Sequence, residues 1–326
     1  MYAIELTPEH PVETLADFAV DAETAGFDGV VASHHYNNRD QFMALTAMAQ
    51  ATEELLLGPG IANPYETHPV TLASRVATLS ELSDGRAIFG VGPGDQATLS
   101  NLGLDHDRPL RRVLETFKIA QDLWDGQRVD HDGTFEAHDA GLNYDAGDIP
   151  VYVGAQGPHM TRMAAKHADG ALYNGAHPKD LEWASEQVQK GKADRPEERG
   201  DFDLAAYASV SIAEDAEVAR EAARIPVAFI AAGSPPPVLD RHGIDRDRAE
   251  QVGDTISAGD FGEASEAVSE AMIDAFCLAG TPETVTRQTE DLLDHADSVI
   301  FASPLGPDVS SAIDLLGAVA DRTRPA

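Results

Sequence analysis

The sequence predicts a single (β/α)8 barrel with insertions. Eight short apolar segments alternate with amphipathic helical patterns, which is typical of a parallel sheet covered on both faces. Eight such units indicate that the sheet closes into a barrel. The alternative, an open doubly wound sheet, lacks its dinucleotide-binding signature. GVGPGD (90–95) has Asp95 where the G-x-G-x-x-G signature has its third glycine, and it comes too late in the chain.

The strand candidates are short runs rich in aliphatic and aromatic residues. Helical patterns follow most of them, for example 11–26, which ends at a glycine, and 68–82. The eight predicted strands are 2–6, 27–32, 55–58, 87–91, 150–153, 170–173, 202–210 and 298–302.

Two segments interrupt the alternation. Residues 125–149 are polar and rich in Gly and Asp, which predicts a surface hairpin. Residues 214–277 predict two or more extra helices around the SPPP break at 234–237. Because no repeat, low-complexity tract or linker separates a second unit, we expect residues 1–326 to form one domain.

The charge balance is extremely acidic. Asp and Glu total 56 against 23 Lys and Arg, a formal net charge of −33, and only five of the basic residues are lysines. Such a surface repels itself at low ionic strength, whereas above 1 M salt the Debye length falls below roughly 3 Å. We therefore expect a protein from a halophile that accumulates salt. Nucleic-acid binding is disfavoured because it needs basic patches.

The remaining composition predicts a cytoplasmic protein. Cys277 is the only cysteine, so neither a disulfide framework nor a cysteine zinc cluster is possible. The N-terminal MYAIELTPEH has no signal-peptide pattern. No window holds 18 uninterrupted apolar residues, so no membrane span is expected.

Polar and glycine-rich loops follow five of the predicted strands. In barrels of this kind the chemistry sits at the carboxyl ends of the strands. We therefore expect these loops to converge on one active-site mouth, with Glu5 at the end of the first strand. The loops are HHYNNR (34–39), GPGIANPYETHP (58–69), GPGDQATLSNLG (92–103), GAQGPHM (154–160) and NGAHPKD (174–180).

With these motifs the chain resembles the coenzyme F420-dependent methylenetetrahydromethanopterin reductases, within the bacterial-luciferase-like barrel superfamily. The matching stretches run in order over nearly the whole chain, and together their spacing is specific. They include YAIE, HYNNR, GPGDQAT, YVGAQGP, HPKD, CLAGTPE and SPLGP. The resemblance implies hydride transfer between a reduced deazaflavin and a 5,10-methylene-tetrahydropterin to give the 5-methyl form, a step of one-carbon metabolism.

Two acidic residues are the predicted catalytic groups. Opening the methylene bridge needs a proton on the departing nitrogen, and a carboxylic acid at the base of a pocket can supply it. Glu5 fits that description, and it matches the family's proton donor by position; its alternative role is to hold a loop or a neighbouring strand. Asp95 is expected beside the substrate or the deazaflavin ring, or as a helix N-cap.

The predicted coenzyme site follows from the glycine and amide loops. The resemblance implies a non-prolyl cis peptide at Gly60–Ile61 that backs the deazaflavin ring. GAQGP offers successive backbone N–H groups at a helix N-terminus, which suits the coenzyme phosphate, although an ordinary tight turn is the alternative. The full predicted set is His35, Asn37, Gly60, Ile61, Asn63, Gly94, Gln96, Ala97, Gly154, Gln156, Gly157, Pro158, Asn174 and His177.

The predicted substrate contacts are His34, Tyr36 and Gln156. His34 departs from the family, whose usual pattern has Asp there, and a histidine does not accept hydrogen bonds from a pterin guanidine edge as a carboxylate does. A metal site at His34–His35 is disfavoured, because adjacent residues of a strand point to opposite sides. No metal is therefore predicted.

Several alternatives stay open. An FMN- or F420-dependent luciferase-like monooxygenase or other oxidoreductase is the second enzyme hypothesis, with FMN as the alternative coenzyme. A non-catalytic barrel subunit is the third, although an intact Glu5, Asp95 and GAQGP argue against it. Tetrahydromethanopterin and tetrahydrofolate are equally acceptable carriers. Barrels of the family usually associate, so we expect a homo-oligomer, a dimer or a tetramer.

Overall fold

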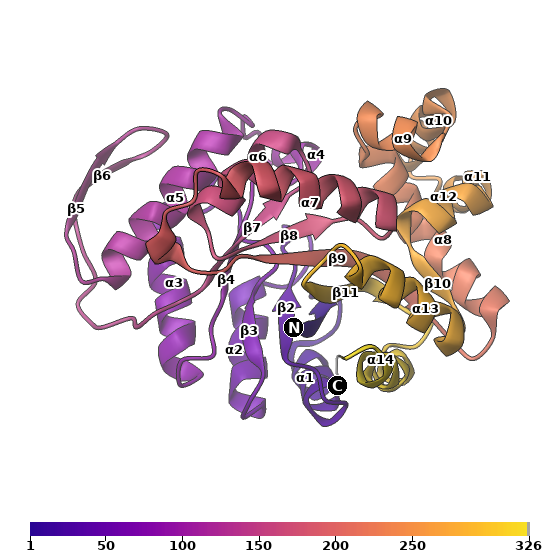
Figure 1. Ribbon diagram of the computed structural model, residues 1–326, viewed down its shortest axis with the longest axis horizontal. Helices are drawn as coiled ribbons and strands as arrows, with labels where there is room; N and C mark the ends of the chain where they lie inside the picture. The colour runs from indigo at the N-terminus through magenta and orange to yellow at the C-terminus, as the bar shows by residue number, and fades with distance from the viewer. Residues whose placement is uncertain (325–326) are drawn as a thin grey trace.

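The computed structural model describes residues 1–324 and forms a closed parallel barrel (Figure 1). The order around the barrel is β1-β2-β3-β4-β7-β8-β9-β11, and β11 pairs with β1. Bridges between Leu57 and Ala87 and between Ala62 and Val91 close the seam between β3 and β4. The eight strands are β1 (Tyr2–Leu6), β2 (Gly29–Ala32), β3 (Leu56–Pro59), β4 (Phe89–Val91), β7 (Val151–Ala155), β8 (Gly170–Asn174), β9 (Asp203–Ile212) and β11 (Ser298–Leu305).

This architecture confirms the predicted barrel, and each of the eight predicted strands corresponds to one of these strands. The structure extends β9 to Ile212 and β11 to Leu305, two or three residues beyond the predicted ends. A ninth strand, β10 (Leu278–Gly280), was not predicted. It pairs with the last residues of β9, and its three residues are too few to give a periodic signal.

One acidic residue precedes each of three strands and fixes the barrel at its amino-terminal end. Each carboxylate accepts a hydrogen bond from the backbone N–H of the first or second residue of the neighbouring strand. These aspartates therefore stabilise the end of the barrel opposite the mouth. The pairs are Asp28 with Tyr2 at 2.6 Å, Asp169 with Val151 at 2.8 Å and Asp297 with Leu204 at 2.9 Å.

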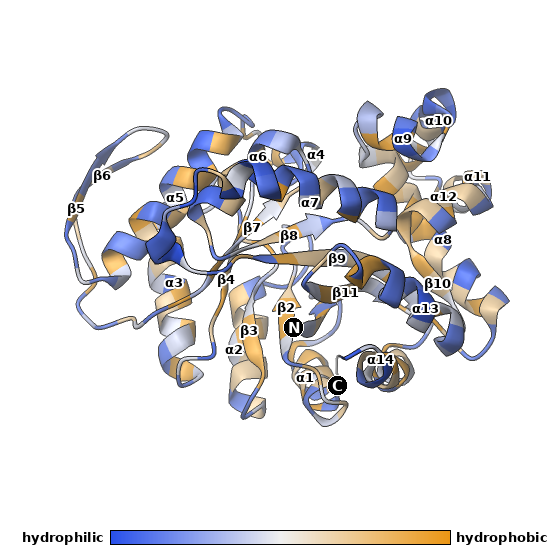
Figure 2. Cartoon of the chain, viewed as in Figure 1, coloured by the Kyte–Doolittle hydropathy of each residue, from blue (hydrophilic) through white to orange (hydrophobic). Residues whose placement is uncertain are grey.

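Amphipathic helices surround the barrel and bury their apolar sides against it (Figure 2). Helix α1 ends beside Gly26, whose φ of +84° few other residues adopt. The helices that cover the barrel are α1 (Val12–Thr24), α2 (Gln41–Ala51), α3 (Pro69–Leu82), α5 (Pro109–Trp124), α6 (Pro158–His167), α7 (Pro178–Lys192), α13 (Pro282–Leu293) and α14 (Val309–Thr323). The short α4 (Gln96–Asn101) follows β4, and a 3₁₀ turn spans Glu197–Arg199.

Residues 125–149 contain an antiparallel hairpin that stands away from the barrel (Figure 1). Its strands are β5 (Val129–Asp132) and β6 (Glu136–Ala140). Glu115 of α5 holds the turn by accepting from the Thr134 N–H and hydroxyl, each at 2.7 Å, and from His131. Burial alone would raise the pKa of Glu115, but these hydrogen bonds and one from Arg111 outweigh it and lower that pKa to about 2.

Residues 214–277 form five helices on one side of the barrel, seen at the right of Figure 1. They bury an apolar core of their own, which includes Val227, Val252, Met272 and Ile273. The helices are α8 (Ala216–Gly233), α9 (Pro236–His242), α10 (Arg246–Ser257), α11 (Phe261–Ala267) and α12 (Glu270–Phe276).

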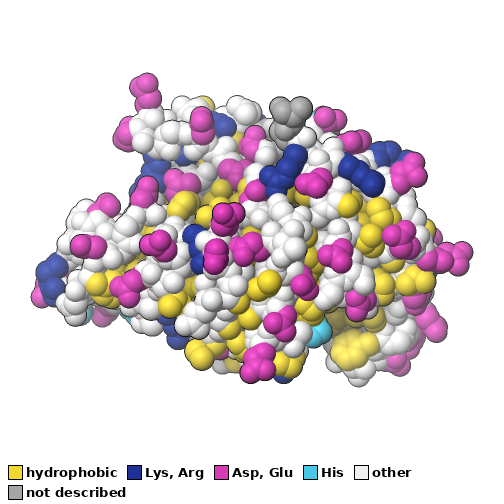
Figure 3. Space-filling model, turned by 90° about the horizontal axis from the view of Figure 1, so that it is seen from below, with side chains coloured by type: hydrophobic (Ala, Val, Ile, Leu, Met, Phe, Trp, Pro, Cys, Tyr) yellow, Lys and Arg dark blue, Asp and Glu magenta, His cyan; other side chains and the backbone are white. Residues whose placement is uncertain are grey.

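Acidic side chains are spread over the face seen from below, with few Lys and Arg between them (Figure 3). The exposed acids lie on many separate helices and loops, so the charge is a property of the whole surface. Within residues 1–324, no helix is both long and apolar enough to cross a membrane.

Candidate active site

Glu5 lies on β1 and is only 3% exposed. The Thr7 hydroxyl donates to its Oε1 at 2.7 Å, and the Ser303 backbone N–H donates to its Oε2 at 2.9 Å. The carboxyl group is thus buried, oriented by two donors, and placed where β1 and β11 reach the mouth. That geometry suits a group that moves a proton to or from a bound molecule.

Gly60 and Ile61 line the centre of the mouth, and the peptide bond between them is cis. The hydroxyl of the partly buried Tyr207 donates to the Gly60 carbonyl at 3.0 Å. Burial, and secondarily the negative charge of Glu5, raise the pKa of Tyr207 well above its ordinary value, so the phenol stays a donor. A Cβ on Gly60 would lie 2.7 Å from Val31, which explains why only glycine fits there.

The Ile61 side chain packs between two glycines of neighbouring strands. Cβ atoms added to Gly92 and Gly154 would lie 3.0 and 3.1 Å from Ile61. Because Gly92 and Gly154 carry no side chains, Ile61 packs directly against their backbone at the bottom of the mouth. The bottom of the mouth is therefore formed by backbone and one aliphatic side chain, a surface without protruding groups that suits a flat ring.

Asp95 begins α4 and acts as its N-cap. Its carboxylate accepts from the Thr98 N–H at 2.7 Å. The adjacent Gly94 has a φ of +72° and packs against Asn63, 3.2 Å from a would-be Cβ. Gln96 is exposed in the first turn of the same helix, so the loop presents polar groups to the mouth. Ala97 follows it within α4.

Asn63 is buried and organises its own loop. Its side-chain oxygen accepts from the backbone N–H groups of Tyr65 and Glu66, both at 3.1 Å. Its amide nitrogen donates to the Glu66 carboxylate at 2.5 Å. The side chain thus fixes the β3–α3 loop, in addition to any contact with the predicted coenzyme.

The loop after β2 carries His34, His35, Tyr36 and Asn37. His34 Nε2 lies 2.9 Å from Glu66 Oε2, while Tyr36 is 46% exposed and its hydroxyl accepts from Asn101 at 3.4 Å. His35 and Asn37 are exposed. β2 ends at Ala32, so strand alternation does not govern His34 and His35, and our reason for doubting a chelate there was wrong.

GAQGP passes from β7 into α6 (Pro158–His167), and Gly157 is the N-cap. Gly157 has extended backbone, with φ −92° and ψ 159°, and Pro158 follows at the first helical position. Within the described part of the chain, no heavy atom beyond Gly157 and its two chain neighbours lies within 4 Å of a Cβ built on Gly157. Free space therefore adjoins the first N–H groups of a ten-residue helix, an arrangement that favours an anion.

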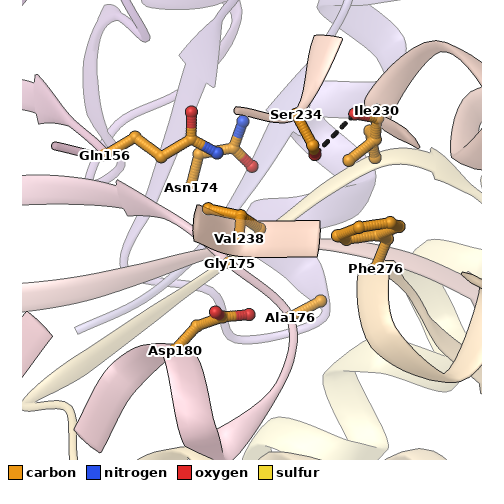
Figure 4. A pocket seen from close by; sticks show the side chains of 9 residues that line it. All are labelled: Gln156, Asn174, Gly175, Ala176, Asp180, Ile230, Ser234, Val238 and Phe276. Atoms are coloured by element: carbon orange, nitrogen blue, oxygen red, sulfur yellow. Dashed lines mark hydrogen bonds between the residues drawn. The ribbon is translucent and has the colours of Figure 1, made fainter. Parts of the chain in front are cut away.

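A small pocket lies beside Gln156 and Asn174, whose amide groups appear on the same side of it in Figure 4. Its free volume of about 10 Å³ fits about one water molecule, so it is a recess of the mouth rather than a ring-binding site. The other lining residues belong to the β8–α7 loop, α7 and the inserted helices: Gly175, Ala176, Asp180, Ile230, Ser234, Val238 and Phe276.

His177 caps α7, with its Nδ1 accepting from the Lys179 N–H at 3.1 Å. Burial, and then the neighbouring His242, lower the pKa of His177, so its ring is neutral near pH 7. Asp180 accepts from Arg241 and from His242, the latter at 2.8 Å. This buried cluster fastens the inserted helix α9 to α7 beside the mouth.

The structure gathers Glu5 and residues from all five predicted loops at one end of the barrel. It also adds contacts that sequence reasoning missed: Thr7, Ser33 and Ser303 around Glu5, Tyr207 behind Gly60, and Glu66 beside His34. Thr7 directly follows β1, and Ser303 directly follows the predicted strand 298–302, so their place in TP and SPLGP was the signal available. Over residues 1–324, no group of three or more His, Cys, Asp or Glu side chains is placed to hold a metal ion.

The closed barrel and the residues at its mouth indicate the broad protein family to which the chain belongs. The sequence pattern of the luciferase-like monooxygenase family matches residues 3–296, and the chain belongs to that family. A solved F420-dependent secondary alcohol dehydrogenase shares the fold, with a TM-score of 0.79 over 100% of this chain and 99% of its own, at 19% identity.

Within that class the chain belongs to the family of 5,10-methylenetetrahydromethanopterin reductases. It is 41% identical to the enzyme of Archaeoglobus fulgidus over 97% of both chains, and 40% identical to that of Methanopyrus kandleri over 97% of this chain and 96% of the relative. The solved coenzyme F420-dependent tetrahydromethanopterin reductase from M. kandleri superposes with a TM-score of 0.90 at 39% identity, covering 97% of this chain and 96% of that one.

Proposed function

We propose that the protein transfers a hydride between reduced coenzyme F420 and a 5,10-methylene-tetrahydropterin, giving the 5-methyl form. The observation that carries the proposal is a buried, doubly hydrogen-bonded Glu5 at the mouth of a barrel that is about 40% identical to such reductases along nearly its whole length. The reaction places hydride on the methylene carbon, breaks its bond to one nitrogen and protonates that nitrogen.

Glu5 supplies the proton in this proposal. It begins the turnover as a carboxylic acid and ends it as a carboxylate, which the Ser303 N–H and the Thr7 hydroxyl then stabilise. Bound reduced F420 supplies the hydride. Because Glu5 is almost fully enclosed, its proton passes to a bound nitrogen rather than to bulk water.

The residues of the mouth fit a deazaflavin coenzyme. Gly60 and Ile61 provide a flat support for a ring, and Gly92 and Gly154 keep it free of protruding side chains. The open space at Gly157 and the N-terminus of α6 suit the coenzyme phosphate. Exposed His35, Asn37, Gln96 and Asn174 offer polar contacts at the rim.

The pterin lies, in this proposal, between the ring of the coenzyme and the loop after β2. Gln156, His34 and Tyr36 are its proposed contacts. Glu66, which pairs with His34 at 2.9 Å, places a carboxylate next to the position where the family usually has Asp. A carboxylate there accepts hydrogen bonds from the amino-pyrimidinone edge of the pterin.

Two further parts of the proposal concern the coenzyme and the assembly. A solved monooxygenase from Streptomyces bottropensis is only 20% identical to this chain, with a TM-score of 0.70, a likeness of fold alone. The relatives near 40% identity favour F420 over FMN. We also propose that the chain forms a homo-oligomer, which light scattering in molar KCl measures.

The test is turnover in 3 M KCl with reduced F420 and methylene-tetrahydromethanopterin, followed by the absorbance of oxidised F420. We expect turnover at steady state, and binding of F420 but not of FMN. The methylene-tetrahydrofolate assay run in parallel identifies the carrier. Absence of turnover with both carriers, or tight binding of FMN alone, would overturn the proposal.

A further inference from the structure

We propose that Thr7 returns a proton to Glu5 after each turnover, as the inner member of a hydroxyl relay that begins at Ser33 and Ser303. The inference rests on the proposed role of Glu5 as the general acid. A Glu5 carboxylate that has given up its proton must regain one before the next substrate reacts, and the hydride transfer does not supply it. We assign this reprotonation to the three hydroxyl groups.

The hydrogen bonds form a continuous chain into Glu5. The Thr7 hydroxyl donates to Glu5 Oε1 at 2.7 Å and accepts from the Ser33 hydroxyl at 3.2 Å. Thr7 Oγ1 also lies 2.8 Å from the Ser303 hydroxyl oxygen. A hydroxyl has one proton to donate and two lone pairs to accept with, so Thr7 satisfies all three contacts when both serines donate to it.

The burial of these groups sets the direction in which a proton moves along the hydrogen bonds. Glu5 is buried, whereas Thr7, Ser33 and Ser303 are each partly exposed. Among residues 1–324, the hydrogen-bond partners of the Glu5 carboxylate are the Thr7 hydroxyl and the Ser303 N–H. The amide proton is held in a peptide bond, which leaves the Thr7 hydroxyl as the contact able to pass a proton inward.

The transfer balances without any change in oxidation state. The Thr7 hydroxyl proton moves to Glu5 Oε1, and Thr7 Oγ1 takes the proton of Ser33 or Ser303. That serine takes a proton from hydronium in the solvent, which leaves water, and the hydroxyl groups then rotate back. Two serines converge on one threonine, so the relay has two entrances and a single final step at Thr7.

Single-turnover and steady-state kinetics separate this role from a structural one. In Thr7→Val, which keeps the shape and removes the hydroxyl, the first turnover starts from protonated Glu5. We expect a burst of F420 oxidation, equal to one coenzyme per active site, and a burst rate that falls less than the steady-state rate, because the lost hydroxyl also held Glu5 Oε1. The following steady-state rate is expected to be about 10- to 100-fold below wild type.

Matched variants complete the test. Thr7→Ser restores the hydroxyl and is expected to restore the steady-state rate, whereas Ser33→Ala and Ser303→Ala each close one entrance, and only the double variant is expected to reproduce the loss in Thr7→Val. Thr7→Val with an unchanged steady-state rate would overturn the relay. So would a first turnover slowed as much as the steady state, since Thr7 would then only orient Glu5. Failure of the proposed function would instead appear in the wild type, as absent turnover.

Discussion

Substituting Gly157 with valine tests the proposed phosphate site while sparing the fold. The backbone at Gly157 is extended, with φ −92° and ψ 159°, a conformation that valine adopts readily and that a following proline favours. Among the described residues other than its two chain neighbours, none has a heavy atom within 4 Å of the added Cβ. Neither the backbone nor packing therefore requires glycine here, and the new side chain would occupy the open space in front of α6.

The size of the effect follows from the contacts that the side chain would block. A backbone N–H that binds a phosphate oxygen makes a charge-assisted hydrogen bond worth about 1.5–3 kcal/mol. Loss of one such bond corresponds to roughly 10- to 150-fold weaker binding. We expect Gly157→Val to weaken coenzyme binding within that range and to leave the melting temperature within about 2 °C of wild type.

The assay is a titration of the protein with F420 in 3 M KCl, read by the fluorescence of the coenzyme. Gly262→Val is the matched control, because Gly262 is exposed on the inserted helix α11 and its nearest atom, Asp260 Oδ1, is 3.8 Å from a would-be Cβ. A dissociation constant for Gly157→Val equal to that of the control would refute a phosphate site at GAQGP.

Three further predictions concern stability and the second acid. The net charge of −33 predicts a cooperative fold by circular dichroism in 3 M KCl and a much less stable one in 0.1 M KCl; equal stability in both would end the halophile hypothesis. Because the pKa of Glu115 is lowered from about 4.5 to about 2, its stabilising effect is complete above pH 4.5 and is lost as the pH falls towards 2. Glu115→Gln should cost about 1.5–3 kcal/mol at pH 7 and little at pH 2 in urea unfolding, and a loss independent of pH would contradict this. Asp95→Asn keeps an equally good N-cap, so a large fall in turnover with an unchanged melting temperature is expected if the carboxylate faces the reaction, and unchanged turnover would limit Asp95 to capping.

The sequence was sufficient for the barrel because most of its strands bury both of their faces. YAIEL, for example, is apolar except for Glu5, and all five residues are buried. Glu5, the exception in this strand, was also the candidate acid. Burying a carboxyl group inside an apolar strand is unfavourable in free energy unless hydrogen-bond donors hold it. The loops that follow the strands had to meet at one end, because all eight strands are parallel.

The sequence pattern could not predict contacts between segments that lie far apart in the chain. His34 and Glu66 are 32 residues apart, and Glu5 and Ser303 are 298 residues apart. No local spacing predicts either pair, because barrel closure brings them together. Sequence reasoning also could not show that Asn63 and His177 are already engaged in holding their own loops.

Turnover of Glu5→Gln, with coenzyme binding measured in parallel, decides whether this buried acid drives the reaction. Glutamine keeps the shape of the side chain, and its oxygen can still accept from the Ser303 N–H that now lies 2.9 Å from Glu5 Oε2. We expect the rate with reduced F420 and the methylene-pterin to fall by a factor on the order of 10²–10⁴, while the dissociation constant for F420 changes little. Turnover within about threefold of wild type would contradict the assignment of Glu5 as the general acid and would move that role to Asp95.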